Sequence, residues 1–272
     1  MVRTDGTRAL NGVGLLLSAP THRDPAVDVL AGALAAVDAG MAAGCSSVWV
    51  GEPSADPPDR VAYEAYSLLG ALAARTGSIH LGVSADGEQR RVPSMLAKIV
   101  TAVDVLSHGR AALSLDGDAA RDGDADRLDE ALAVARAVLE DDHPTFDGRI
   151  YHVDDAVNRP APVQAGGVPL VVFVQGRGPG LVGLLEVCAR AADAVVVHGG
   201  PDGVRDALGV LGGAVPARHR EGARTRVLAR VSAGPGVTGT LAAVRSAGAD
   251  GCLVEVPAPW DAAGLRSADL AW

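Results

Sequence analysis

The chain has 272 residues, of which 48% are hydrophobic and 21% are charged, and its formal net charge is -9. This length and composition fit a globular protein with one large core or two small domains. The acidic balance argues against a nucleic-acid-binding protein, which would present a basic face, and no apolar stretch reaches the roughly 18 residues that a membrane span needs.

The cysteines and the N-terminal segment indicate the compartment. Cys45, Cys188 and Cys252 are far apart and odd in number. Their spacing fits neither a zinc site nor a disulfide framework, which favours a reducing environment. The first twelve residues contain no apolar signal core. We therefore expect a cytoplasmic protein.

Apolar segments of strand length alternate with segments of helical periodicity along the chain. The sequence predicts eight strands, at residues 13–17, 47–50, 78–83, 110–115, 169–174, 194–198, 226–231 and 251–256. It predicts helices at residues 28–43, 62–75, 93–106, 126–141, 179–192, 204–211 and 261–270. A short hairpin with an Asp-Gly turn is expected at residues 146–151.

Eight strands alternating with helices in a chain of this length fit a single (β/α)₈ barrel, the TIM barrel, over residues 1–272. A doubly wound open sheet is the alternative fold. In such a barrel the reactive residues lie at the C-terminal ends of the strands. This rule alone selects Glu52, Ser84, residues 116–118, residues 176–179, His198 and Glu255.

The segment at residues 168–180, VPLVVFVQGRGPG, joins an unbroken apolar run to a glycine-rich turn. The run is typical of a strand buried on both faces, and Pro179 suits the first position of a helix. Such a turn leaves free amides at a helix N-terminus, where the helix dipole favours an anion. Gly176, Arg177, Gly178 and Pro179 are therefore candidates for a phosphate cradle. An ordinary turn between a strand and a helix is the alternative.

The segment at residues 116–126 is rich in aspartate. Asp122, Asp124 and Asp126 have the alternating spacing of a calcium loop, but Arg127 stands where an EF-hand needs glycine. We therefore interpret this segment as a solvated loop that leads into a helix, and we predict no metal site.

Two other strand-end residues each allow two interpretations. His198 ends a predicted strand, so it could take part in catalysis or could cap the strand end. Glu52 could support a cofactor site or could form an ion pair that holds the rim of the barrel.

Seven segments follow one another along the chain: SSVWVGE, LAARTGSIHLGV, RRVPSMLAK, AVDVLSHGRAALSL, DRLDEALAVAR, FDGRIYHV and RPAPVQ. Their order and spacing resemble the luciferase-like monooxygenase superfamily. QGRGPG followed by CARAADAVVV looks most like the branch that uses the deazaflavin F420. The likeness runs from about Val13 to His198, and the C-terminal third is shorter than usual for the family. The resemblance implies a TIM barrel with F420 at its mouth (FMN is the alternative), hydride transfer with a small organic substrate, and a homodimer.

The resemblance also implies roles for single residues. Ser84 and Ala85 fall where the family often has a non-proline cis peptide under the isoalloxazine ring. Gly178 matches the turn on the phosphate side, and Gly117 falls in a strand segment that approaches the cofactor with its backbone. Asp118 lies near an acidic residue that donates a proton in some members, and the position of Glu52 after the second strand is also acidic in the family.

The chain departs from the family pattern at two strand ends. Pro53 stands where many deazaflavin-dependent members have histidine. Asp116 replaces a glycine, and its carboxylate would repel a phosphorylated cofactor, although Arg121 and Arg177 could offset part of that charge. These departures favour an alternative, a non-catalytic barrel that acts as a binding or partner protein. A metal-dependent hydrolase is a weaker idea, because no strand-end His and Asp pair has ligand spacing.

The predicted catalytic residues are Asp118, His198 and Glu52. The predicted cofactor-binding residues are Ser84, Ala85, Asp116, Gly117, Arg121, Gly176, Arg177, Gly178 and Pro179.

Overall fold

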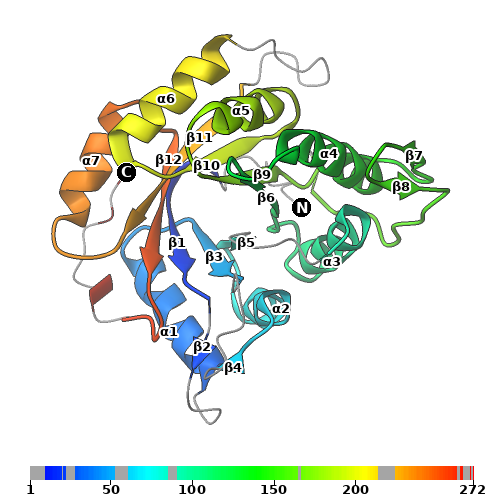
Figure 1. Ribbon diagram of the computed structural model, residues 1–272. Helices are drawn as coiled ribbons and strands as arrows, with labels where there is room; N and C mark the ends of the chain where they lie inside the picture. Colours follow the sequence, from blue (N-terminus) through cyan, green and yellow to red (C-terminus); the bar gives the residue numbers. More distant parts are fainter. Residues whose placement is uncertain are drawn as a thin grey trace.

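The computed structural model describes residues 10–19, 21–22, 28–52, 61–84, 91–164, 167–213, 224–261, 264–265, 270 and 272. In this part of the chain eight parallel strands form a barrel with helices around it, which confirms the predicted TIM barrel (Figure 1). The barrel strands are β1 Gly12–Leu17, β3 Ser47–Gly51, β5 His80–Ser84, β6 Leu113–Asp118, β9 Leu170–Gln175, β10 Ala194–Val197, β11 Arg226–Ser232 and β12 Gly251–Val256.

Seven helices and two short ladders complete the described fold. The helices are α1 Val29–Ala42, α2 Ala65–Arg75, α3 Pro93–Leu106, α4 Asp124–Glu140, α5 Pro179–Ala191, α6 Gly200–Gly213 and α7 Val237–Ser246. The ladders pair β2 Thr21–His22 with β4 Val61–Ala62, and β7 Phe146–Asp147 with β8 His152–Val153. No helix in the described ranges has the length and apolar character needed to cross a membrane.

The barrel strands are mostly apolar on both faces, because one face points into the barrel and the other toward the helices. Inside the barrel, Trp49 and Phe173 meet edge to face with their ring centroids 5.6 Å apart. Gly82 leaves the space that the Trp49 indole occupies, because a Cβ there would lie 2.4 Å from that ring. The larger cluster between strands and helices contains mainly Leu, Val and Ala side chains.

The barrel closes between β5 and β6. An isolated parallel bridge joins Leu81 to Ala111, with the Leu81 amide donating to the Arg110 carbonyl at 2.8 Å. Among the described residues this is the only backbone pairing between the two strands. Farther toward the C-terminal ends, the Ser114 hydroxyl instead donates to the Val83 carbonyl. We call this region, where side chains replace the backbone ladder, the β5–β6 seam.

Arg110 holds this closure from the N-terminal side of the barrel. Its side chain is only 6% exposed. The guanidinium donates to the carbonyls of Ile79, Ala73 and Thr76, at 2.6, 3.0 and 2.8 Å. It therefore ties the start of β6 to the turn between α2 and β5, beside the bridge.

Three of the sequence predictions that differ from the structure concern a strand, the start of a helix and a turn. The strand expected at residues 110–115 is displaced to Leu113–Asp118, because Arg110 lies in the preceding connection and Asp116 pairs with Phe173 of β9. Helix α2 begins at Ala65 instead of residue 62, because the Glu64 carboxylate caps its first amides. The hairpin turn is wider than an Asp-Gly turn: four residues, 148–151, connect its strands. The Glu130 carboxylate of α4 holds this loop by accepting three of its amides.

Helix α7 was not predicted. It follows a stretch rich in glycine and proline, and only Leu241 and Val244 are buried along it, so its apolar stripe is weak. The helix predicted at residues 261–270 is described only at Gly264 and Leu265, which are helical, and the rest of its interior lies outside the described residues.

We expect Arg110→Met to lower the free energy of unfolding by about 2–4 kcal/mol, because it leaves several buried carbonyls without a donor. Urea unfolding would measure this change. Arg75→Met, on the exposed last turn of α2, is the control and should change stability by less than about 0.5 kcal/mol. Equal effects of the two substitutions would show that Arg110 does not hold the closure.

Candidate functional site

The C-terminal ends of the barrel strands bring most of the predicted site residues to one end of the molecule. Asp116, Gly117 and Asp118 end β6, Gly176 follows β9, and His198 follows β10. Glu52 and Ser84 lie at the ends of β3 and β5, where the Glu52 amide donates to the Ser84 carbonyl at 3.2 Å. Ala85, and with it the expected cis peptide, lies outside the described residues, as does Pro53.

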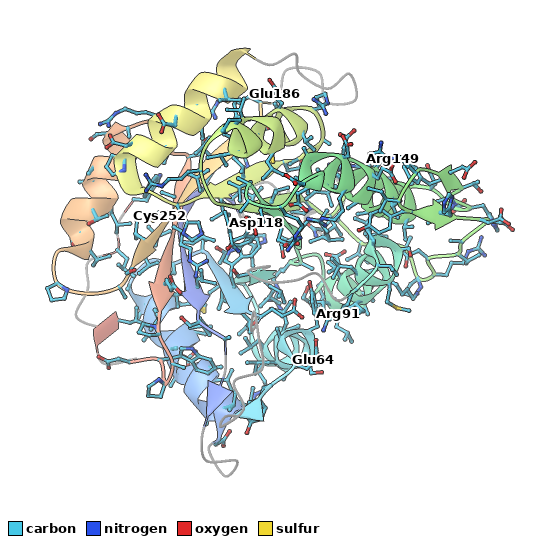
Figure 2. The ribbon with its side chains drawn as sticks, viewed as in Figure 1. Glu64, Arg91, Asp118, Arg149, Glu186 and Cys252 are labelled. Atoms are coloured by element: carbon cyan, nitrogen blue, oxygen red, sulfur yellow. The ribbon has the colours of Figure 1, made fainter. Side chains whose placement is uncertain are left out.

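Glu52 is part of a cluster around Arg91. The Arg91 guanidinium hydrogen-bonds to the Glu52 carboxylate and to Glu64 Oε1, the latter at 2.6 Å (Figure 2). Its carbon Cζ also lies 5.0 Å from the centre of the Tyr66 ring. Glu52 therefore forms the ion pair at the barrel rim that one interpretation expected. Its catalytic role stays a prediction.

Asp116 lies at the β5–β6 seam. The strand alternates, so Asp116 shares the inward face of Ala112, whereas a Cβ on Gly117 would lie 2.9 Å from Leu184 on the helix side. Close packing of β6 against the helices thus explains why position 117 is a glycine. Its backbone contact with a cofactor stays a prediction.

The Asp116 carboxyl is 3% exposed and poorly compensated. Its Oδ1 is 3.7 Å from Arg127 Nη2, and its Oδ2 is 4.0 Å from Arg121 Nη1. Oδ1 has no hydrogen-bond partner among the described residues. Burial raises the pKa of Asp116 to about 6, and the two guanidinium groups only partly oppose that rise.

Asp124 and Asp118 give the acidic loop a defined structure. The Asp124 carboxylate accepts the Asp118 amide at 2.7 Å, Arg127 Nε at 2.6 Å and Arg121 Nη1 at 3.3 Å. Burial alone would raise the pKa of Asp124, but these bonds lower it below its usual value. Asp118 Oδ1 accepts the Ala120 amide. The expected solvated loop is therefore wrong at Asp124, which is buried, and Arg127 adds to the charge compensation that was expected from Arg121 and Arg177.

The glycine-rich turn after β9 is open at its centre. Gly178 is the N-cap of α5 with a φ of 85°, and no atom lies within 4 Å of the position that a Cβ would take. Pro179 occupies the first turn of the helix as predicted. At Gly180 a Cβ would lie 2.3 Å from the Ala119 carbonyl oxygen, so the turn packs against the loop that carries Asp118. Gly176 and Arg177 are exposed.

On the other side of the barrel mouth, Glu255 of β12 binds Arg230 of β11. Two hydrogen bonds of 3.0 and 2.7 Å join the guanidinium to the carboxylate, and the Ser18 hydroxyl adds a third at 3.3 Å. These contacts lower the pKa of Glu255, chiefly through Arg230, and the nearby His198 contributes to the shift. His198 itself is exposed.

The sequence interpretation assigned no role to Arg91 or Arg230 and named Arg127 only to reject a calcium site. Arg230 has a recognisable signal, a charged residue inside the apolar strand RVLARVS. Arg127 has the i,i+3 spacing to Asp124 as a signal, whereas Arg91 has none, because its partners lie on other elements. Among the described residues, no group of three or more His, Cys, Asp or Glu side chains is arranged to hold a metal ion.

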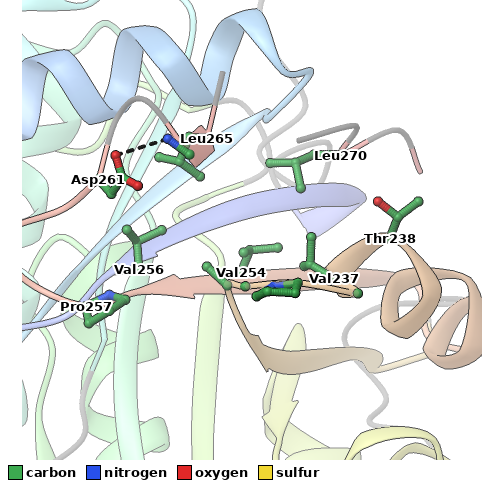
Figure 3. Close-up of a pocket in the computed structure, with 13 residues that line it drawn as sticks. Val237, Thr238, Val254, Val256, Pro257, Asp261, Leu265 and Leu270 are labelled. Carbon is green, nitrogen blue, oxygen red and sulfur yellow. Dashed lines mark hydrogen bonds between the residues drawn. The ribbon is translucent and has the colours of Figure 1, made fainter. Parts of the chain in front are cut away.

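A cavity of about 680 Å³ lies away from these residues, on the helix side of β12 (Figure 3). Val254 and Val256 form its floor, and Val237, Leu265 and Leu270 are among its walls. It is mostly apolar and touches none of the predicted site residues.

The residues at the mouth fit a phosphorylated ring cofactor in two respects. The open Gly178 turn offers amides at a helix N-terminus, where a phosphate is favoured. The inward face of β6 offers a buried carboxyl oxygen that still lacks a donor. The Arg121 and Arg127 side chains offset part of the negative charge that the sequence indicated there.

Comparisons with known proteins show the family of the chain and agree with its barrel fold. Residues 12–238 match the family model described as luciferase-like monooxygenase. The fold is similar to an F420-dependent secondary alcohol dehydrogenase solved with an F420-acetone adduct (TM-score 0.67, 15% identity, covering 94% of this chain and 96% of that chain). It is equally similar to the coenzyme F420 dependent tetrahydromethanopterin reductase from Methanopyrus kandleri (TM-score 0.67, 13% identity, covering 94% and 96%).

A flavin protein is also similar. The oxygenating constituent of 3,6-diketocamphane monooxygenase from Pseudomonas putida, solved with FMN, has a TM-score of 0.56 and 16% identity. The match covers 82% of this chain and 67% of that chain. At these identities the structural likenesses show the barrel fold alone.

The pKa of Asp116 predicts a pH-dependent stability. Burial raises this pKa to about 6. Above about pH 6 the ionised Asp116 therefore destabilises the folded protein, and this destabilisation disappears as the pH falls toward about 4. We expect Asp116→Asn to raise the free energy of unfolding by about 1–3 kcal/mol at about pH 8, and to change it little at about pH 4.

Urea unfolding at several pH values would measure this effect. Asp129→Asn is the control, because Asp129 is half-exposed on α4. A gain from Asp116→Asn that is the same at both pH values would contradict the assigned cause.

Proposed function

The chain belongs to the luciferase-like monooxygenase family, and on that premise we propose that it is an oxidoreductase that uses F420, with FMN as the alternative cofactor. Its substrate would be a small organic molecule bound at the barrel mouth. The observation that carries this proposal is the open Gly178 turn beside the loop of Asp118, at the C-terminal end of the barrel. In a TIM barrel this end is where the active site lies.

Two observations support F420 over FMN. Two of the similar structures are described as F420-dependent enzymes and one as an FMN complex. The sequence QGRGPG also resembles the F420 branch of the family.

When bound, the cofactor would supply hydride transfer at its ring. The amides of the turn at Gly178 and Pro179 would hold its phosphate, with Arg177 beside them. The buried Ser84 would support the ring. Asp118 and His198 are the proposed proton-transfer residues, and Arg91 would keep Glu52 at the rim.

A non-catalytic barrel is the second candidate. The observation in its favour is the carboxyl of Asp116 on the inward face of β6, with only partial charge compensation. In this function the protein would bind a ligand or a partner without hydride transfer. Failure of a folded protein to bind either cofactor would favour it.

The proposal also includes a cytoplasmic location and a homodimer. Cys45, Cys188 and Cys252 are free thiols, which is compatible with a reducing compartment. Val92 and Met95, beside and on the first turn of α3, are exposed apolar side chains that a dimer contact could cover.

Fluorescence titration of the purified protein with F420, and separately with FMN, tests the cofactor. We expect tight binding of one of them, and we expect Gly178→Leu to weaken that binding at least about tenfold, because a side chain would fill the phosphate position. Binding of F420 alone would support the deazaflavin assignment.

Gly236→Leu is the matched control. Gly236 is also a helix N-cap with a positive φ, 89°, and open space around it, but it lies at α7. Both substitutions impose backbone strain, so thermal unfolding of each variant should be measured. Unchanged affinity in a folded Gly178→Leu protein would refute the proposed phosphate site.

A further inference from the structure

A single buried oxygen at the barrel mouth lacks a hydrogen-bond donor. Among the described residues, three buried side-chain atoms have no partner: Asp116 Oδ1, Asn158 Oδ1 and Gln164 Oε1. The two amide groups already donate through their nitrogens, Asn158 to Thr101 and Gln164 to Asp104. Asp116 is the carboxyl among them and stands near the C-terminal end of its strand. A buried polar atom without a partner costs stability unless a ligand or water completes it.

The neighbouring arginines do not supply the missing bond. Arg127 donates hydrogen bonds to Asp124 and to the Asp116 backbone carbonyl, the latter at 2.7 Å. Arg121 also binds Asp124, at 3.3 Å, and stays 4.0 Å from Asp116. Both guanidinium groups are therefore engaged elsewhere, and they face Asp116 at ion-pair distance only.

Charge limits which ligand group this oxygen can accept. Asp116, Asp118 and Asp124 lie together with two arginines, which leaves one negative charge when all three are ionised. An anionic ligand group would add a second uncompensated charge in a partly dry site. A neutral or cationic group with an O–H or N–H bond would supply the donor without that penalty.

We propose that Asp116 is the ligand-recognition residue of this site and that its unpartnered oxygen accepts a hydrogen bond from an O–H or N–H group. This inference rests on the proposed function, because it places the ligand at the same barrel mouth. The donor belongs either to the cofactor ring or to the substrate, and the substrate would then be an alcohol or an amine instead of a carboxylate.

Carbon-13 NMR of aspartate carboxyls tests the proposal, with the Asp116 signal assigned by its loss in Asp116→Asn. The probes are F420, FMN, and the matched set cyclohexanol, cyclohexylamine and cyclohexanecarboxylate. A donor bound to the ionised carboxylate should lower the pKa of Asp116 by about one unit, which corresponds to about tenfold tighter binding above that pKa. Asp116→Asn should weaken binding of the same probe about tenfold or more.

The arms of the experiment separate the two sources of the donor. A shift with F420 or FMN alone identifies the cofactor ring, and a shift only with the alcohol or the amine identifies the substrate. Asp129→Asn, which removes a half-exposed carboxylate paired with Arg190 on the same side of the barrel, should leave affinity unchanged. An Asp116 signal that responds to none of the probes, or only to the carboxylate, would overturn the proposal.

Failure of this inference is distinguishable from failure of the proposed function. If F420 or FMN binds but the carbon-13 signal of Asp116 responds to no probe, the inference fails and the cofactor assignment stands. If neither cofactor binds and Asp116 still responds to the alcohol or the amine, the oxidoreductase proposal fails and the recognition role stands.

Discussion

The buried guanidinium of Arg110 is the interaction on which the shape of the barrel depends. It binds carbonyls of the α2–β5 turn and so fixes the start of β6 beside β5. The backbone bridge between Leu81 and Ala111 forms at this point. Because closure is achieved at the N-terminal side, the C-terminal halves of the two strands need no further ladder. Side chains at the β5–β6 seam can then be polar, and this is where Ser114 and Asp116 lie.

This arrangement places the closure of the barrel and the proposed site at opposite ends of the strands. Below the mouth, apolar side chains fill the interior of the barrel, and Trp49 meets Phe173 edge to face. At the mouth, three ion pairs join side chains from the strand ends and their loops: Arg91 with Glu52, Arg230 with Glu255, and Arg127 with Asp124. Asp116 differs from these paired carboxylates: one of its oxygens has no donor among the described residues, and burial raises its pKa to about 6.

The sequence predicts the fold better than it predicts the site. Apolar runs with turn residues between them identify all eight barrel strands, and Pro93 and the His108-Gly109 stop place both ends of α3. The pattern fails where tertiary contacts decide. Strand β6 extends to Asp118 only because β9 pairs with it, and α7 has too weak an apolar stripe to be recognised.

The site residues, like the elements of the fold, are predictable from the sequence only where tertiary contacts do not decide. Strand-end position alone identifies Glu52, Asp116, Asp118 and His198, since it follows from the fold. It does not reveal which arginine pairs with which carboxylate, because the partners come from distant elements. Arg127 is the clearest case: its contact with Asp116 crosses from α4 to β6 and changes the charge balance that the sequence implied.

A crystal structure of the protein grown with F420 or FMN would test the central claim, that the C-terminal mouth of the barrel is a cofactor site. We expect the phosphate to bind the amides that follow Gly178 and the ring to lie over the ends of β5 and β6. A cofactor bound elsewhere, such as in the apolar cavity on the helix side of β12, would contradict it.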